Sequence, residues 1–295
     1  MEISIQGLTK KYGGDKFGLK NFSLELTNGI LGLIGPNGAG KSTLMRILAT
    51  ISKPTDGHLF LDGADIVRSP NNVRKVLGYL PQDFGVYQNL TAVEFLEYLG
   101  AIKGFSGKNL KKRIDALLAD LNLTAVRNNQ ITTYSGGMRQ RIGIAQVLLG
   151  DPKLIILDEP TVGLDPEERV RFRNLLTDLS GERIVILSSH IVSDIETIAN
   201  DIAIINQGRL LTHDYPDEIM KTVDNHVYEG LADNDEFEMF RSNYHVINSM
   251  RKGERWQVRF ILNPGKKLPS FPVQAVNGTL EDAYLKIIGT AKEGK

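Results

Sequence analysis

Residues 35–43 read GPNGAGKST, with three glycines, one lysine and two hydroxyl side chains in a short stretch. The spacing matches the phosphate-binding pattern G-x-x-x-x-G-K-[ST] at Gly35, Gly40, Lys41 and Ser42. Glycines in such a loop let backbone N–H groups curl around phosphate oxygens, and a helix that begins at Ser42 adds its positive end. The stretch therefore predicts a nucleotide phosphate site, and a glycine-rich turn without a ligand is the alternative.

The sequence on both sides of this loop favours the phosphate site. LGLIG (31–35) is an apolar strand candidate, and STLMRILAT (42–50) has apolar positions at helical spacing. Two further apolar runs, KLIILDEP (153–160) and RIVILSSH (183–190), end in polar residues. Continuous apolar strands suit a parallel sheet covered on both faces, and ligands of such sheets lie at the carboxyl ends of the strands. We therefore expect an α/β fold in which these polar clusters converge.

The acidic pair that ends LIILDEP indicates what the site does with the phosphate. Asp158 ends an apolar strand, where it can hold Mg²⁺ through a water molecule. Glu159 follows it and can polarise an attacking water as a general base. The alternative is a surface acidic pair that begins a turn before Pro160. Beside a phosphate loop, the pair favours hydrolysis of the bound nucleotide.

Composition excludes some function classes. Lys and Arg total 35 and Asp and Glu total 35, so a neutral chain offers no bulk attraction for nucleic acid or for an anionic membrane. There is no cysteine, which excludes disulfides and thiolate metal sites and fits a reducing compartment. The apolar runs are far shorter than the roughly 20 residues that span a bilayer, and MEISIQGLTKKYGG lacks the apolar core of a secretion signal. We expect a soluble chain whose membrane part, if it has one, comes from a partner.

The pattern of apolar and polar residues changes at two places along the chain. Between 90 and 130, LTAVEFLEYLGAIKG and KNLKKRIDALLADLNL have helical periodicity, which predicts a helical insertion between two halves of the sheet domain. From about 216 a different pattern begins. HVINSM (245–250) and RWQVRFIL (255–262) are strand candidates, and TLEDAYLKIIG (279–289) is a final helix. This tail predicts a small separate α+β domain.

YSGGMRQRIGIAQVLL (134–149) predicts a second phosphate-binding surface. Ser135 is a candidate N-cap, and Ser135, Gly136 and Gly137 expose backbone N–H groups at a helix start. One chain does not need two such surfaces for one γ-phosphate, whereas two chains that face each other head to tail would use both. An ordinary capped helix is the alternative.

With these motifs in this order, residues 1–215 resemble the ATP-binding subunits of ABC transporters. The family signature is usually LSGGQ; here Tyr134 and Met138 replace its first and last residues. The resemblance implies ATP and Mg²⁺ as cofactors. It also implies a P-loop NTPase fold, with a RecA-like parallel sheet core, an N-terminal antiparallel β subdomain and a helical subdomain at about 84–148. Residues 216–295 would form the small C-terminal α+β accessory domain.

The resemblance assigns roles to four further residues. Gln82 in GYLPQDFGVYQNLT corresponds to the Q-loop glutamine, a ligand of Mg²⁺ and of the catalytic water. Asp165 in GLDP corresponds to the D-loop aspartate that reaches across a dimer, and His190 to the switch histidine that senses the γ-phosphate. Tyr12 in KKYGG corresponds to the aromatic residue that stacks on adenine, with Phe17 as the alternative, and such stacking would tolerate GTP.

The expected site is therefore as follows. The catalytic residues are Glu159, His190 and Gln82, and the metal ligands are Ser42, Gln82 and Asp158. The residues expected to bind the nucleotide are Tyr12, Gly35, Pro36, Asn37, Gly38, Ala39, Gly40, Lys41, Ser42, Thr43, Ser135, Gly136, Gly137 and Asp165.

Two copies would trap two ATP molecules, open after hydrolysis, and drive separate integral membrane permease subunits docked near 84–100. YLPQDFGVYQNLTAVEFLEYL and the ending TLEDAYLKIIG look most like ATPases of bacterial ABC-2 exporters. The resemblance implies a homodimer held at the cytoplasmic face of the membrane, with no nucleic-acid partner. One alternative is a soluble, non-transport ATPase that acts on ribosomes or DNA, and another is a regulatory subunit that binds ATP without hydrolysis. The transported substrate does not follow from this sequence.

Overall fold

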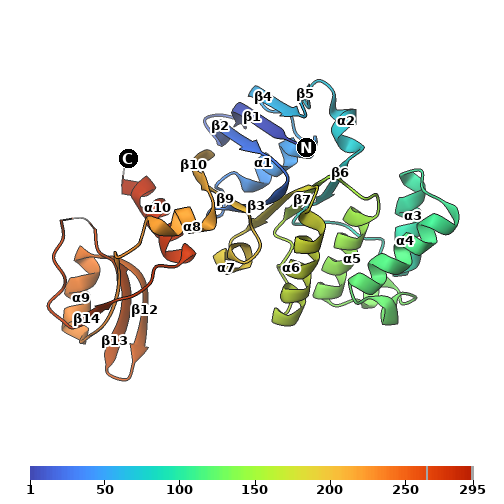
Figure 1. The fold of residues 1–295 in the computed structure, drawn as a ribbon. Coiled ribbons are helices and arrows are strands. Elements are labelled where there is room, and N and C mark those ends of the chain that lie inside the picture. Colours follow the sequence, from blue (N-terminus) through green and yellow to red (C-terminus); the bar gives the residue numbers. More distant parts are fainter. Residues whose placement is uncertain (264, 294–295) are drawn as a thin grey trace. The chain divides into compact units, whose positions relative to one another are not determined.

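The structure is a computed structural model that describes residues 1–263 and 265–293. Its contacts divide the chain into two compact units, one that ends at His213 and one that begins at Asp214 (Figure 1). Each unit is described by itself below.

A six-stranded sheet forms the centre of the first unit, in the order β10-β9-β3-β8-β7-β6. Strands β9, β3, β8, β7 and β6 run parallel to their neighbours in that row. Every residue of β7 and β8 is buried, because helices cover both faces of the sheet. This confirms the parallel α/β core predicted from the apolar runs. The strands are β3 (Gly29–Ile34), β6 (Leu77–Leu80), β7 (Leu154–Asp158), β8 (Ile184–Ser189), β9 (Asp201–Asn206) and β10 (Arg209–Asp214).

A second, four-stranded antiparallel sheet lies at the start of the chain, in the order β2-β1-β4-β5. Its apolar side chains share one core with the central sheet and with helix α1 (Lys41–Leu48). Burial against α1 fixes the loop that precedes this helix between the two sheets. The helix begins one residue earlier than predicted. The strands are β1 (Ile3–Lys11), β2 (Phe17–Leu26), β4 (Asp56–Leu61) and β5 (Ala64–Asp65).

Helices fill the chain between β6 and β7, as the helical insertion predicts. Helices α3, α4 and α5 pack together in Figure 1, and α3 begins with a capping box formed by Thr91 and Glu94. Helices α6 and α7 follow β7 and β8. The bounds are α2 (Pro70–Arg74), α3 (Ala92–Ile102), α4 (Gly107–Asp120), η1 (Thr124–Val126), η2 (Ile131–Thr133), α5 (Gly136–Leu148), α6 (Pro166–Ser180) and α7 (Val192–Glu196).

The second unit contains an antiparallel sheet in the order β12-β13-β11-β14. Phe237 and Phe240 of α9 pack on Val258 and Phe260 of β13, and Trp256 stacks on Phe237 with ring centroids 4.5 Å apart. Strands β12 and β13 and helix α10 match the sequence prediction. The elements are α8 (Pro216–Lys221), β11 (Val227–Ala232), α9 (Asn234–Asn243), β12 (His245–Lys252), β13 (Arg255–Ile261), β14 (Val273–Ala275) and α10 (Leu280–Glu293).

Within the described residues, no helix combines the length and the apolar composition that a membrane crossing requires.

Candidate active site

A cavity of about 530 Å³ lies where the phosphate loop meets the antiparallel sheet. Residues from five segments of the chain form its wall, so the fold brings together motifs that are far apart in the sequence. The lining residues are Tyr12, Lys16, Phe17, Gly18, Asn37, Gly38, Ala39, Gly40, Lys41, Ser42, Thr43, Gln82 and Glu159.

The glycines of the loop hold a backbone that other residues would strain. Gly38 and Gly40 have φ angles of 77° and 113°, in the region that favours glycine. A Cβ atom on Gly40 would lie 2.3 Å from the carbonyl oxygen of Gly18, and one on Gly35 would lie 2.2 Å from that of Ile205. The loop can therefore bend back and lead directly into α1, whose N-terminal N–H groups would favour an anion bound in the cavity.

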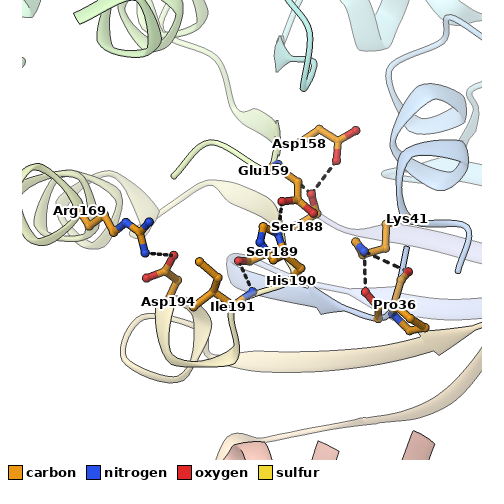
Figure 2. Close-up of polar contacts among 11 residues, drawn as sticks. Pro36, Lys41, Asp158, Glu159, Arg169, Ser188, Ser189, His190, Ile191 and Asp194 are labelled. Carbon is orange, nitrogen blue, oxygen red and sulfur yellow. Dashed lines mark hydrogen bonds and ion pairs between the residues drawn. The ribbon is translucent and has the colours of Figure 1, made fainter. Parts of the chain in front are cut away.

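Lys41 supplies the positive charge of the loop. Its ammonium group is buried and donates hydrogen bonds to the carbonyl oxygens of Gly35 at 2.6 Å and Pro36 at 3.4 Å (Figure 2). Burial lowers the pKa of Lys41, and the charges of Glu159 and Asp158 oppose that shift. The two carbonyl groups are neutral partners, so a phosphate oxygen would be a stronger acceptor for the same donor.

The acidic pair lies at the carboxyl end of β7, beside the end of β8. The hydroxyl of Ser188 donates to Oδ1 of Asp158 at 2.7 Å and accepts the backbone N–H of Glu159 at 2.9 Å (Figure 2). Both carboxylate residues and Ser188 are buried. The sequence prediction did not include Ser188, although it lies two residues before the predicted His190 in the same polar strand end.

Glu159 combines a strained backbone with a direct contact to His190, the predicted switch histidine. Its φ angle is 53°, which is unusual for a residue with a side chain and costs on the order of 1–3 kcal/mol. The Oε2 atom of Glu159 forms a hydrogen bond with Nδ1 of His190 (Figure 2). The strained turn thus directs the Glu159 carboxylate toward His190. Glu159 also lines the cavity.

Both aromatic candidates for a base platform border the cavity. Tyr12 is 40% exposed, and its hydroxyl lies 3.3 Å from Oγ1 of Thr43 in the loop. Phe17 lies on the same wall, with the ammonium groups of Lys11 and Lys20 over its ring. The geometry brings each of the two to the site and does not select one.

Gly35, Pro36, Asp158 and His190 do not line this cavity but adjoin Lys41 and Glu159, which do. Ser135, Gly136, Gly137 and Asp165 are also absent from its wall. They begin two helices instead. The Ser135 hydroxyl caps α5 by accepting the N–H of Met138 at 3.2 Å, which confirms the predicted N-cap, and Asp165 caps α6. The head-to-tail hypothesis requires such separation, because these residues would serve the nucleotide of a second chain.

Tyr134 occupies the place of the leucine in the usual signature. It is buried, and its hydroxyl donates to the carbonyl oxygen of Val126 at 2.8 Å. The carbonyl oxygen of Tyr134 in turn accepts from Arg139 at 2.7 Å. The substitution therefore adds a polar anchor for the signature turn while keeping an apolar body in the core.

Comparison with known proteins supports the family resemblance that the motifs indicate. The sequence pattern of the family described as ABC transporter matches residues 19–162. The chain is 38% identical over 213 residues to ABC transporter A family member 8 of Dictyostelium discoideum, which covers 69% of this chain and 25% of that protein. It is 33% identical over 219 residues to the daunorubicin resistance ATP-binding protein DrrA3 of Streptomyces coeruleorubidus, which covers 74% of this chain and 69% of that protein.

The chain thus spans a quarter of the first relative's length. A solved structure supports the fold: the dimeric structure of a post-hydrolysis state of an ATP-binding cassette bound to ADP and Pi. It superposes with a TM-score of 0.67 at 26% identity and covers 72% of this chain and 98% of that one. The phosphate loop, the acidic pair and residues 134–138 lie within the range 19–162 that matches the family pattern, and the match to DrrA3 extends over most of both chains. The chain therefore belongs to the family of ABC transporter ATP-binding proteins.

Proposed function

We propose that this chain hydrolyses ATP and uses the cycle of binding and hydrolysis to drive a separate membrane permease. The observation that carries the proposal is the contact between Glu159 and His190 at the edge of the cavity behind the phosphate loop. A domain that only binds nucleotide has no need for a carboxylate positioned by a histidine. In this proposal, the γ-phosphate of a loop-bound ATP would end beside this pair.

The residues around the cavity fit the steps of hydrolysis. Lys41 and the loop N–H groups would hold the phosphates, and Glu159 would accept the proton of the attacking water. His190 would keep the Glu159 carboxylate oriented. The hydroxyl, amide and carboxylate oxygens of Ser42, Gln82 and Asp158 suit a hard cation, and Mg²⁺ held by them would neutralise phosphate charge.

A second copy of the chain would complete each site. Ser135, Gly136, Gly137 and Asp165, which begin α5 and α6 and do not line the cavity of their own chain, would act on the ATP of the partner. The similarity to a dimeric cassette bound to ADP and Pi supports this arrangement. Closure would need the γ-phosphate, and its loss would open the dimer, so the pair acts as a switch between two states.

The work of the switch would be transport, and the helical insertion and the relatives both support this. An exposed aromatic pair, Tyr87 and Tyr98, forms an edge contact on the segment expected to meet a permease. One relative is named for daunorubicin resistance, which favours an exporter. We therefore place the chain at the cytoplasmic face of the membrane, bound to a permease and without a nucleic-acid partner.

A capture experiment tests this function. Tagged Glu159→Gln protein would be recovered with ATP and Mg²⁺ from detergent-solubilised membranes of its host, with Lys41→Ala protein as the control in which nucleotide binding is weakened. We expect a polytopic membrane protein in the first sample, and stimulation of the wild-type ATPase when the two are reconstituted in vesicles. Recovery of only ribosomal or DNA-repair components would contradict the transport function and support the soluble alternative.

A further inference from the structure

The first turn of α6 joins two parts of the site that the catalytic residues leave unconnected. Asp165 caps this turn, and its Oδ1 atom accepts the N–H of Glu168 at 2.9 Å. The side chains of Glu168 and Arg169, three and four residues after Asp165, contact different neighbours. Glu168 contacts the signature helix α5, and Arg169 contacts the segment that follows His190.

The link from Glu168 to α5 is short and shielded. Its Oε1 atom lies 2.6 Å from Nη2 of Arg141, and the two side chains are 20% and 14% exposed. The other terminal nitrogen of Arg141 donates to the carbonyl oxygens of Leu121 at 2.9 Å and Asn122 at 3.1 Å, just after α4. One guanidinium group therefore fastens α4, α5 and α6 to each other at the base of the signature turn.

Gly137 shows how closely the Glu168 carboxylate lies against that turn. A Cβ atom on Gly137 would be 2.5 Å from Oε2 of Glu168. Any side chain at position 137 would displace the carboxylate, which Arg141 holds in place. Gly137, which follows the Ser135 cap by two residues, therefore lies directly against the Glu168 carboxylate.

The link from Arg169 is longer. Its Nε atom donates to the carbonyl oxygen of Leu164 at 3.2 Å, and its Nη1 atom lies 3.7 Å from Oδ2 of Asp194 on α7 (Figure 2). The Asp194 side chain is 7% exposed, and among the described residues its Oδ2 atom accepts no hydrogen bond. A separation of 3.7 Å is an ion pair without a hydrogen bond, so this link can still shorten.

We propose that Glu168 and Arg169 are positioning residues that couple the signature turn of a chain to its own switch histidine. Glu168 fixes residues 135–137, which serve the partner's ATP under the proposed function on which this inference rests. Arg169 fixes the segment that carries His190, which serves the chain's own ATP. Because the two residues are adjacent in one helical turn, a shift of the signature turn moves Arg169 against Asp194.

The Glu168 side of the proposal is tested by dimer formation. Glu168→Ala would be placed in the Glu159→Gln chain, and sedimentation velocity with ATP and Mg²⁺ would give the dimer dissociation constant. We expect an increase of about tenfold, because removal of one partner of a shielded charge pair leaves Arg141 uncompensated. Calorimetry should give the same ATP affinity for the monomer within about twofold, since the cavity residues are untouched.

The matched control is Glu167→Ala. Glu167 lies in the same first turn, carries the same charge and pairs with Arg171 at the surface, where its side chain is 77% exposed. An equal effect of Glu167→Ala and Glu168→Ala would overturn the proposal. If Glu168→Ala does not fold, Glu168→Gln keeps the size of the side chain and decides by the same comparison. If the Glu159→Gln parent itself stays monomeric, the proposed dimer fails instead.

The Arg169 side is tested by steady-state kinetics of the otherwise wild-type chain. Arg169→Ala should lower kcat about tenfold and leave KM within about twofold, because it loosens the His190 segment without touching the nucleotide cavity. Arg171→Ala, on the same helix and 54% exposed, should leave both unchanged. Equal values for the two variants, or a change in KM alone, would overturn this half of the proposal.

Discussion

The hydroxyl of Ser188 donates a hydrogen bond of 2.7 Å to the Oδ1 atom of Asp158 and so joins the ends of two neighbouring strands. The register of the parallel pair β7 and β8 sets Asp158 directly beside Ser188. The same hydroxyl oxygen accepts the N–H of Glu159, whose backbone has a positive φ angle. One buried side chain therefore orients the proposed metal ligand and stabilises the turn of the proposed base.

Ser188→Ala should reduce kcat by about 10- to 100-fold, because loss of a supporting hydrogen bond disorders the groups that it orients. The affinity for ATP should change little, since the loop and Lys41 are untouched. A coupled assay of ATP turnover and a calorimetric titration measure the two effects separately.

Ser189→Ala is the control for that experiment. The Ser189 hydroxyl accepts the N–H of Ile191 at 2.9 Å and forms no hydrogen bond with the carboxylates among the described contacts. It should reduce kcat far less than Ser188→Ala. Equal losses from the two variants would show that Ser188 acts through strand stability and not through Asp158 and Glu159.

Lys41→Ala should weaken ATP binding by at least about tenfold, because it removes a buried charge-assisted donor from the loop. Lys16→Ala is the matched control. Lys16 also borders the cavity, but it is exposed, so solvent screens its charge. Titration calorimetry of both variants should show a much larger loss for Lys41, and unchanged affinity in Lys41→Ala would contradict the phosphate-loop assignment.

Tyr134→Phe should lower the free energy of unfolding by about 1 kcal/mol, since it deletes the hydrogen bond to the half-buried carbonyl oxygen of Val126, which keeps only the N–H of Asn129 as a donor. Circular dichroism during urea unfolding measures the change. Tyr134→Leu restores the usual family residue but leaves a smaller side chain in a buried place, so it should cost more than Tyr134→Phe. A more stable leucine variant would show that the tyrosine has no anchoring role.

The second unit should lose stability in acid. Burial opposes the shift, but hydrogen bonds from Arg259 and Thr279 hold the pKa of Asp282 below its ordinary value of 3.8. A lowered folded-state pKa contributes stability above the ordinary value, and this stability is lost as the pH falls through the folded-state pKa. The urea concentration at the midpoint of unfolding should therefore decrease when the pH is below about 4.

Trp256 makes that loss measurable in the full chain, because it is the one tryptophan of the sequence and lies in the second unit. Its emission during urea unfolding should report a lower midpoint at pH 3 than at pH 6. Asp282→Asn should cost about 2 kcal/mol at pH 6 and should flatten the dependence on pH. An equal pH dependence in the variant would assign the acid loss to other carboxylates.

The sequence predicted those parts of the site that a local pattern encodes. GPNGAGKST, the apolar runs of β7 and β8, and the Ser135 cap each lie within one short stretch, and the structure places all of them as expected. Strand β11 was missed because VYEGLA places a glycine and a glutamate where a strand pattern needs apolar residues. Helix α9 was missed because its sequence is mostly polar.

The contacts that hold the site together could not be predicted in the same way. Ser188 meets Asp158 only because the register of two parallel strands brings them level. Glu168 meets Arg141 and Gly137 through the packing of two helices that start in different loops. Such partners depend on tertiary structure, and nothing within a short window of sequence marks one serine or one glutamate among its neighbours.

In the proposed cycle, two chains close around ATP and open after Glu159 completes hydrolysis. Sedimentation velocity of the Glu159→Gln protein, with and without ATP and Mg²⁺, tests it most directly, alongside its steady-state ATPase rate. We predict a monomer without nucleotide, a stable dimer with ATP, and turnover reduced by at least about 100-fold. A variant that stays monomeric with ATP, or that keeps a near-normal ATPase rate, would rule out this cycle.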